Sequence, residues 1–283
     1  QFRDTGIYIN SSADGQLDIV ADTEIQIAAT TIDVNGNVDI SGTLGISGDV
    51  TLADGADLIT ASAGTSNFRA GVNAGNSIES GGNYNTVVGD EAGTAITTGD
   101  ENTAVGYAAL SANTTGTGNV ALGKDALLAN TTGVNNVAAG DSALQAITTG
   151  SNNTSIGDKA LTADTLGSHS VAIGKGALGA QNFTSATNTY NTAVGSNAGA
   201  AVTTGVQNTL IGGLAGDALT DADYNVALGY SALSTNVLGS RSTAIGNNAL
   251  LTQNPASAAD MYNVGVGHNA GRAITTGIQN TLI

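Results

Sequence analysis

The chain has 283 residues, with 40 Gly, one Pro, no Cys and only 4% aromatic residues, a composition that matches neither collagen nor a disulfide-rich scaffold. A hydrophobic content of 41% argues against disorder, and the formal charge of −16 would repel nucleic acid or an anionic membrane surface. Because of this charge we expect no nucleic-acid partner. No apolar run is long enough to span a membrane, so we expect no membrane insertion. Because most apolar side chains are small, we expect thin layers of a repeat protein.

Residues 1–60 carry pairs of apolar residues, such as Leu17 with Ile19, that recur every six to eight positions. Gly36, Gly42 and Gly48 mark turns six residues apart, so each strand is too short to form a sheet within one chain. The stretch DGQLDIVADTEIQIAATTIDVNGNVDISGTL resembles the triple-stranded β-helical stems of phage tail fibres and spikes. This resemblance implies an intertwined triple-stranded stem over 1–60. Residues 61–82, rich in Ala, Ser, Gly and Asn, are expected to form a junction.

Residues 83–283 contain a repeat that is marked by an anchor Gly. Successive anchors are 17 residues apart, except that the gaps after Gly174 and after Gly246 are 21 residues. A repeat of about this length is typical of solenoids. The pattern predicts eleven coils and the start of a twelfth, and the chain stops where the next anchor would follow, which indicates a segment of a longer protein. The anchors are Gly89, Gly106, Gly123, Gly140, Gly157, Gly174, Gly195, Gly212, Gly229, Gly246 and Gly267.

An Asn lies four residues before most anchors, with Ser170 and Ser242 as the two exceptions. Asn side chains stacked at a turn can bond backbone groups and their own equivalents in the coils above and below. The spacing therefore predicts a structural ladder and requires no ligand. Its members are Asn85, Asn102, Asn119, Asn136, Asn153, Asn191, Asn208, Asn225 and Asn263.

The residues between this ladder and the anchor are mostly Thr, Val, Ile and Leu, which favour a short strand. Three residues after each anchor every copy has Ala, which predicts a tightly packed position. The next residue is Leu or Gly, and Gly is paired with an aliphatic residue three positions later, as in Gly93 with Ile96. One large side chain per coil is thus expected to fill one hole from either of two positions; Leu144 with Ile147 breaks this rule.

A 17-residue circuit has a perimeter of about 56 Å, enough for two short facing strands around a single layer of side chains. So thin a coil leaves apolar side chains on its lateral faces, which a ring of three chains would bury. We therefore predict an all-β fold: a parallel β-helix or β-roll solenoid with 17-residue coils that follows the stem and assembles as a homotrimer.

The segments NTAVGYAALSANTTG and NVALGKDALLANTTG resemble the head repeats of trimeric autotransporter adhesins and related repeats in bacteriophage tail fibres. The resemblance covers 83–283 and falls on the Asn, the β-branched pair and the anchor Gly. It implies a left-handed parallel β-roll in each chain and side-by-side trimers. The coil length departs from the usual adhesin head, because the coils of this chain are longer.

Few residues have the types and spacing that chemistry needs. The two histidines, His169 and His268, lie in different coils without Cys or a repeated carboxylate beside them. Asp90 with Glu91 could in principle bind Ca²⁺ or act as acid and base, but other copies do not repeat the pair. We expect no catalytic site, no metal and no cofactor.

Two features are candidates for contact with a receptor. Tyr recurs five residues before the anchor, as in Tyr190 and Tyr262, where it could stack on sugars or cover the rim of the coil. The two four-residue insertions, which contain Phe183 and Pro255, are expected to form loops on one face, either for recognition or as tolerated loops without a partner.

The favoured function is a structural fibre protein of a virion, a phage tail fibre that gives reach and attachment to the host cell surface through a glycan or a protein. The alternative is a trimeric adhesin on the bacterial cell surface. A trimeric polysaccharide depolymerase is the third hypothesis, but it needs clustered carboxylates or a nucleophile with its base, and the sequence displays neither.

Overall fold

The computed structural model describes residues 8–10, 18–20 and 63–283, which belong to two compact units, Gln1–Ala56 and Asp57–Ile283. In the first unit β1 (Tyr8–Asn10) pairs antiparallel with β2 (Asp18–Val20). The rest of the expected stem lies outside the described residues, so the intertwining of three chains there stays a prediction. In the described ranges no helix is long and apolar enough to cross a membrane.

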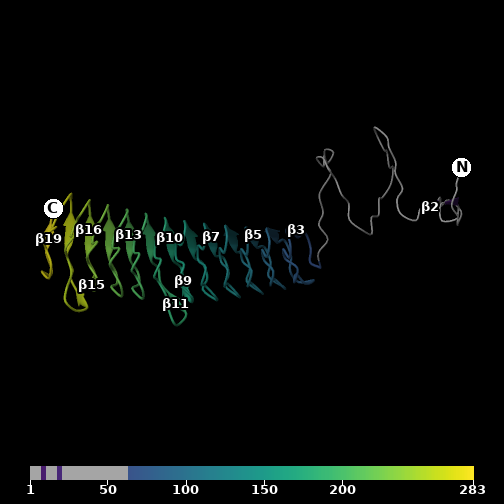
Figure 1. Ribbon diagram of the computed structural model, residues 1–283. Coiled ribbons are helices and arrows are strands. Elements are labelled where there is room, and N and C mark those ends of the chain that lie inside the picture. Colours follow the sequence, from purple (N-terminus) through teal and green to yellow (C-terminus); the bar gives the residue numbers. More distant parts are fainter. Residues whose placement is uncertain (1–7, 11–17, 21–62) are drawn as a thin grey trace, which may run out of the picture. The chain divides into compact units, whose positions relative to one another are not determined.

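The second unit is a parallel β-solenoid built on one sheet of 13 strands whose order in space follows the sequence (Figure 1). Each strand pairs with the strands of the coils before and after it, and no helix occurs in 63–283. This confirms the predicted all-β solenoid. The strands are β3 (Phe68–Ala70), β4 (Thr86–Val88), β5 (Thr103–Val105), β6 (Val120–Leu122), β7 (Val137–Ala139), β8 (Thr154–Ile156), β10 (Val171–Ile173), β12 (Thr192–Val194), β13 (Thr209–Ile211), β14 (Val226–Leu228), β16 (Thr243–Ile245), β18 (Val264–Val266) and β19 (Thr281–Leu282).

The register matches the sequence period. Ala104 pairs with Ala121, and Ala121 pairs with Ala138, so each coil sets equivalent residues of the repeat side by side. One boundary differs from the expectation: β3 lies inside 61–82 and pairs with β4 in the same sheet. The segment expected to be a junction therefore contains the first coil of the solenoid. Asn67 occupies the ladder position there, but the strand Phe-Arg-Ala that follows it lacks the Thr or Val with which the later strands begin.

The anchor glycines take a backbone conformation that other residues rarely adopt, with φ between 127° and 140°. At Gly106 a Cβ would lie 2.7 Å from the carbonyl oxygen of Gly123, the anchor of the next coil. The anchors thus stack directly on one another, and both the backbone angle and the lack of space require Gly.

The core is one layer of aliphatic side chains inside each coil, in which small Ala residues lie beside Leu or Ile. The Ala three residues after the anchor is fully buried from Ala92 to Ala249. The Leu or Gly that follows has a left-handed backbone, with φ of 56° at Leu110 and 54° at Gly93. β-branched residues strongly disfavour this conformation, which explains why Ile occupies only the later position, as at Ile96. Nothing in the structure explains why the coil of Leu144 has a large residue at both positions.

Candidate functional site

The Asn residues of the ladder lie inside the coils, not at exposed turns, and all nine are fully buried. The backbone N–H of Asn102 donates to Oδ1 of Asn85 at 2.9 Å, and its side-chain amide donates to the carbonyl of Gly116 at 2.9 Å. Asn119 repeats the backbone bond to Asn102 at 3.0 Å. The bonds are all within the chain, so the ladder holds the coils together and offers no surface to a ligand.

The two Ser exceptions belong to a polar arrangement that the sequence analysis missed. Ser170 and Ser242 each precede a 21-residue coil, and that coil supplies a buried Gln seven residues after its anchor. The amide of Gln181 donates to Oγ of Ser170 at 2.9 Å and its oxygen accepts from Asn191 at 2.9 Å. Gln253 makes the same two bonds in the second long coil, to Ser242 and Asn263. A Gln amide therefore fills the gap left by the shorter Ser.

Asp164 is a fully buried carboxyl group beside the first long coil. It accepts hydrogen bonds from the backbone N–H of Gly167 at 3.0 Å and from the side chain of Gln181 at 2.6 Å. Burial raises the pKa of Asp164 above its ordinary value, and these bonds oppose the rise. The equivalent residue before the second long coil is Asn236, whose side chain bonds the backbone of Gly239 within its own coil.

The two insertions widen their coils on the same edge of the solenoid, where two small parallel sheets form (Figure 1). In the first, β9 (Gly167–Ser168) pairs with β11 (Thr187–Asn188), and in the second β15 (Gly239–Ser240) pairs with β17 (Ala259–Asp260). The exposed tips are 184–186 and 256–258.

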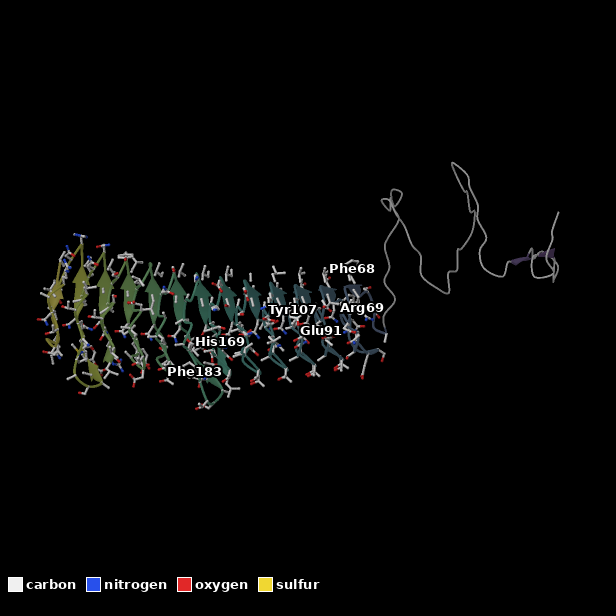
Figure 2. All side chains as sticks on the ribbon, in the orientation of Figure 1. Phe68, Arg69, Glu91, Tyr107, His169 and Phe183 are labelled. Atoms are coloured by element: carbon white, nitrogen blue, oxygen red, sulfur yellow. The ribbon has the colours of Figure 1, made fainter. Side chains whose placement is uncertain are left out.

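Two of the four candidate receptor contacts need correction. Phe183, labelled in Figure 2 within the first insertion, is only 6% exposed, and Pro255 is buried in the second insertion. Both side chains pack under their loops because an apolar residue at the base of a widened coil covers the interior that the insertion opens. They are therefore not available to touch a receptor. Tyr190 and Tyr262 are 53% and 50% exposed.

These two tyrosines belong to what we name the edge column, the residues five positions before each anchor. Its side chains lie one per coil along one edge, and its backbone has φ between 50° and 69° throughout. The column consists of Tyr84, Glu101, Gly118, Asn135, Asn152, His169, Tyr190, Gln207, Tyr224, Arg241 and Tyr262.

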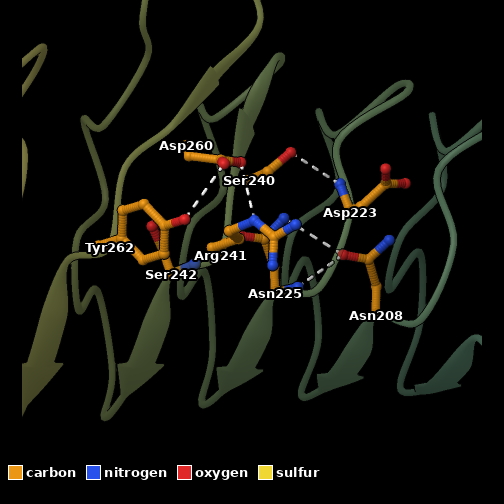
Figure 3. A network of polar contacts seen from close by, with 8 residues as sticks. All are labelled: Asn208, Asp223, Asn225, Ser240, Arg241, Ser242, Asp260 and Tyr262. Atoms are coloured by element: carbon orange, nitrogen blue, oxygen red, sulfur yellow. Dashed lines mark hydrogen bonds and ion pairs between the residues drawn. The ribbon is translucent and has the colours of Figure 1, made fainter.

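Neighbours in the C-terminal half of the edge column contact one another. The rings of His169 and Tyr190 stack with centroids 5.2 Å apart. The guanidinium of Arg241 lies 4.5 Å from the ring centroid of Tyr224. It pairs with Asp260 at 3.0 Å, and the hydroxyl of Tyr262 bonds the same carboxylate at 3.2 Å (Figure 3). Asp260 and, more weakly, the neighbouring tyrosines raise the pKa of Arg241.

A second surface runs along the outer face of the 13-stranded sheet. In the strands of this sheet from β4 to β16 the middle residue is buried in the core, whereas the last residue, directly before the anchor, points outward. From β4 to β18 these outward residues are all aliphatic, and we name them the aliphatic stripe. Six of them are 36% to 43% exposed: Val105, Leu122, Ile156, Ile211, Leu228 and Val266.

No group of His, Cys, Asp and Glu within the described ranges could hold a metal ion. His169 faces Tyr190, and His268 is exposed. Comparisons with protein families, with curated proteins and with solved structures found no match to this chain.

Proposed function

We propose that the chain is the shaft of a virion fibre, a phage tail fibre in which three parallel copies give reach and attachment to the host cell surface. The single observation that carries the proposal is the aliphatic stripe, because it continues along the eleven strands from β4 to β18, over about 48 Å. Single exposed aliphatic side chains are ordinary, but an uninterrupted row of them is typical of a surface that another chain covers.

The distribution of charge favours a second and third copy of the same chain as the cover. Within the 13-stranded sheet, the strands that follow β3 contain no charged residue, while the chain as a whole carries a formal charge of −16. Association through the stripe buries uncharged faces and leaves the acidic surfaces apart in water. A ring closes with the same patch used by every copy, whereas an open arrangement would leave one stripe exposed.

Light scattering on the purified chain tests the assembly. The expected mass is about three times the 27.6 kDa of one chain, because the proposal places three chains in a closed ring around their aliphatic stripes. Replacing Leu122 and Leu228 by Lys should release monomers, since charges would enter the buried stripe. The same change at Tyr107 and Tyr230, which are 52% and 56% exposed elsewhere on the coil, is the matched control. A stable wild-type monomer would contradict the proposal.

Attachment is tested with the labelled protein on a panel of bacterial strains, where binding to whole cells of some strains is expected and binding to none of them contradicts the role. Catalysis is not part of the proposal, because the buried ladder amides bond one another and the backbone, the buried Asp164 carboxyl bonds Gln181 and Gly167, and no acid and base pair forms among these described interior residues. Release of sugar from strain polysaccharide would overturn that part.

A further inference from the structure

The edge column changes in character along the solenoid. From the coil before the first insertion to the end of the second, on six consecutive coils, it carries His169, Tyr190, Gln207, Tyr224, Arg241 and Tyr262. The three coils directly before this stretch have Asn152, Asn135 and Gly118 at the same position, the residue types that a left-handed backbone accepts most readily, and the two coils before those have Glu101 and Tyr84. Large planar side chains here are neither favoured by the backbone nor needed for the core, because the tyrosines are 41% to 53% exposed. Such an unfavourable placement is typical of a functional surface.

The planar groups of this stretch are held in place before any partner arrives. His169 stacks on Tyr190, and Arg241 is fixed between the ring of Tyr224 and the carboxylate of Asp260. The backbone N–H of Arg241 donates to the carbonyl of Asp223 in the previous coil at 3.0 Å, which anchors this position to the sheet. Side chains that are already ordered lose little entropy on binding.

We propose that the edge column from His169 to Tyr262 binds an extended, uncharged polysaccharide chain. Tyr190, Tyr224 and Tyr262 are spaced two coils apart, about 9.6 Å, close to the length of two pyranose units in an extended β-1,4-linked chain. One face of Tyr190 is covered by His169 and one face of Tyr224 by Arg241, so these rings offer their uncovered face and exposed edge to the C–H groups of alternate sugars. The Gln207 amide offers donors and an acceptor to the sugar hydroxyls.

The charges on the surface favour a neutral ligand. The only Lys or Arg in this stretch of the edge column, Arg241, is paired with Asp260, so it leaves little attraction for a polyanion. The formal charge of −16 adds repulsion. The inference rests on the proposed attachment function and names the ligand class for it.

The test is affinity electrophoresis of the full chain in native gels that contain hydroxyethyl cellulose, a neutral β-1,4-linked probe, with carboxymethyl cellulose as its charged counterpart. The expected result is retardation by the neutral polymer and much weaker retardation by the charged one. The triple variant Tyr190→Asn, Tyr224→Asn and Tyr262→Asn should bind the neutral polymer about tenfold more weakly, which corresponds to a loss of about 1.4 kcal/mol in binding free energy. Asn occupies this column naturally at Asn135 and Asn152, so the variant is expected to fold.

The matched control replaces Tyr107 and Tyr230 by Asn, because these tyrosines are equally exposed but lie directly after the anchor, and Asn247 occupies that column naturally. Unchanged retardation is expected for the control. Equal retardation of the triple variant and the wild type, or no retardation of the wild type, would overturn the proposal. If the triple variant lost attachment to cells without any binding of wild type to the polymer, the surface would instead recognise a protein. Light scattering of the same samples measures the assembly separately. A failure of the proposed fibre assembly can therefore be distinguished from a failure of polysaccharide binding.

Discussion

The side-chain amide of Gln181 donates a 2.6 Å hydrogen bond to the buried carboxyl group of Asp164, across two neighbouring coils of the solenoid. The bond links the base of the first insertion to the coil beneath it. The second insertion has Asn236 in place of Asp164, and no bond of this kind connects Asn236 to Gln253 among the described residues. The chain thus contains a matched pair of long coils that differ in one titratable group.

This difference predicts a pH-dependent stability. Burial raises the folded-state pKa of Asp164 above the ordinary value of 3.8, so its contribution to stability is fully present below that value and is lost as pH rises through the folded pKa. The free energy of unfolding of Asp164→Asn, minus that of wild type, should therefore grow with rising pH across this window and stay constant above it. Each unit of pKa difference contributes about 1.4 kcal/mol.

Thermal or denaturant unfolding between acid and neutral pH measures this difference. The mirror substitution Asn236→Asp is the control, because it places a carboxyl at the equivalent buried position. The free energy of unfolding of this variant, minus that of wild type, should fall as pH rises. A difference between Asp164→Asn and wild type that does not vary with pH would show that the carboxyl titrates normally.

The Gln residues that replace the missing ladder amides should be important for stability. Gln181→Ala would leave the buried amide of Asn191 and the hydroxyl of Ser170 without these partners, at an expected cost of about 1–3 kcal/mol. Gln207→Ala, at an exposed position, should change the free energy of unfolding by less than about 0.5 kcal/mol. Denaturant titration compares the two, and equal effects would contradict the structural role of Gln181.

Much of the solenoid could be predicted from the sequence, because one period repeats eleven times and its Gly, Ala and Asn positions each obey one physical constraint. The register of the sheet follows the anchor spacing, as in the pairing of Ala104 with Ala121. The first coil was not predicted because β3 has Phe68 and Arg69 where later copies have Thr or Val followed by an uncharged residue, mostly Ala. Its anchor, Gly71, also lies one position further from Gly89 than the regular period allows.

The direction of individual side chains was harder to predict. Asn is common at exposed turns, so the period alone could not reveal that the ladder is buried. Phe183 and Pro255 each lie in only one of the two insertions, at a position that the regular coils lack. No repeat pattern could therefore show that these side chains pack inward. The pairing of Ser170 with Gln181 could have been found, because the same Ser and Gln recur at Ser242 and its long coil.

The buried Ala after each anchor should resist enlargement. Ala126 is fully buried inside its own chain, so Ala126→Leu inserts three carbon atoms into a filled layer and should cost about 1–3 kcal/mol in each chain. Ala186→Leu at the exposed tip of the first insertion serves as the control and should leave melting unchanged. An unaffected melting temperature for Ala126→Leu would place that side chain in solvent.

The anchor glycines should be even less tolerant. Gly106→Ala combines an unfavourable φ of 132° with a Cβ that would lie 2.7 Å from the carbonyl oxygen of Gly123. The backbone conformation alone should cost about 1–3 kcal/mol. At Gly213 a Cβ would meet the ring of Tyr230 at 3.5 Å, an ordinary contact, and Gly213→Ala should be nearly neutral. Comparable melting temperatures for the two variants would contradict the stacking of anchors.

The last prediction concerns the tips of the two insertions. Segments 184–186 and 256–258 are exposed, whereas the bases of the loops are fixed by β9 with β11 and by β15 with β17. Replacing both tips by Gly-Ser-Gly should therefore leave the melting temperature and the assembly unchanged, because no buried contact is removed. If the proposed attachment function holds, we expect weaker attachment to host cells, since the exposed tips would recur in every copy of the proposed fibre, where weak contacts add. Binding assays on whole cells, with the assembly checked by light scattering, measure this effect. Full attachment by the tip-replaced fibre would restrict recognition to the coils themselves, and a loss of assembly would show that the tips contact neighbouring chains.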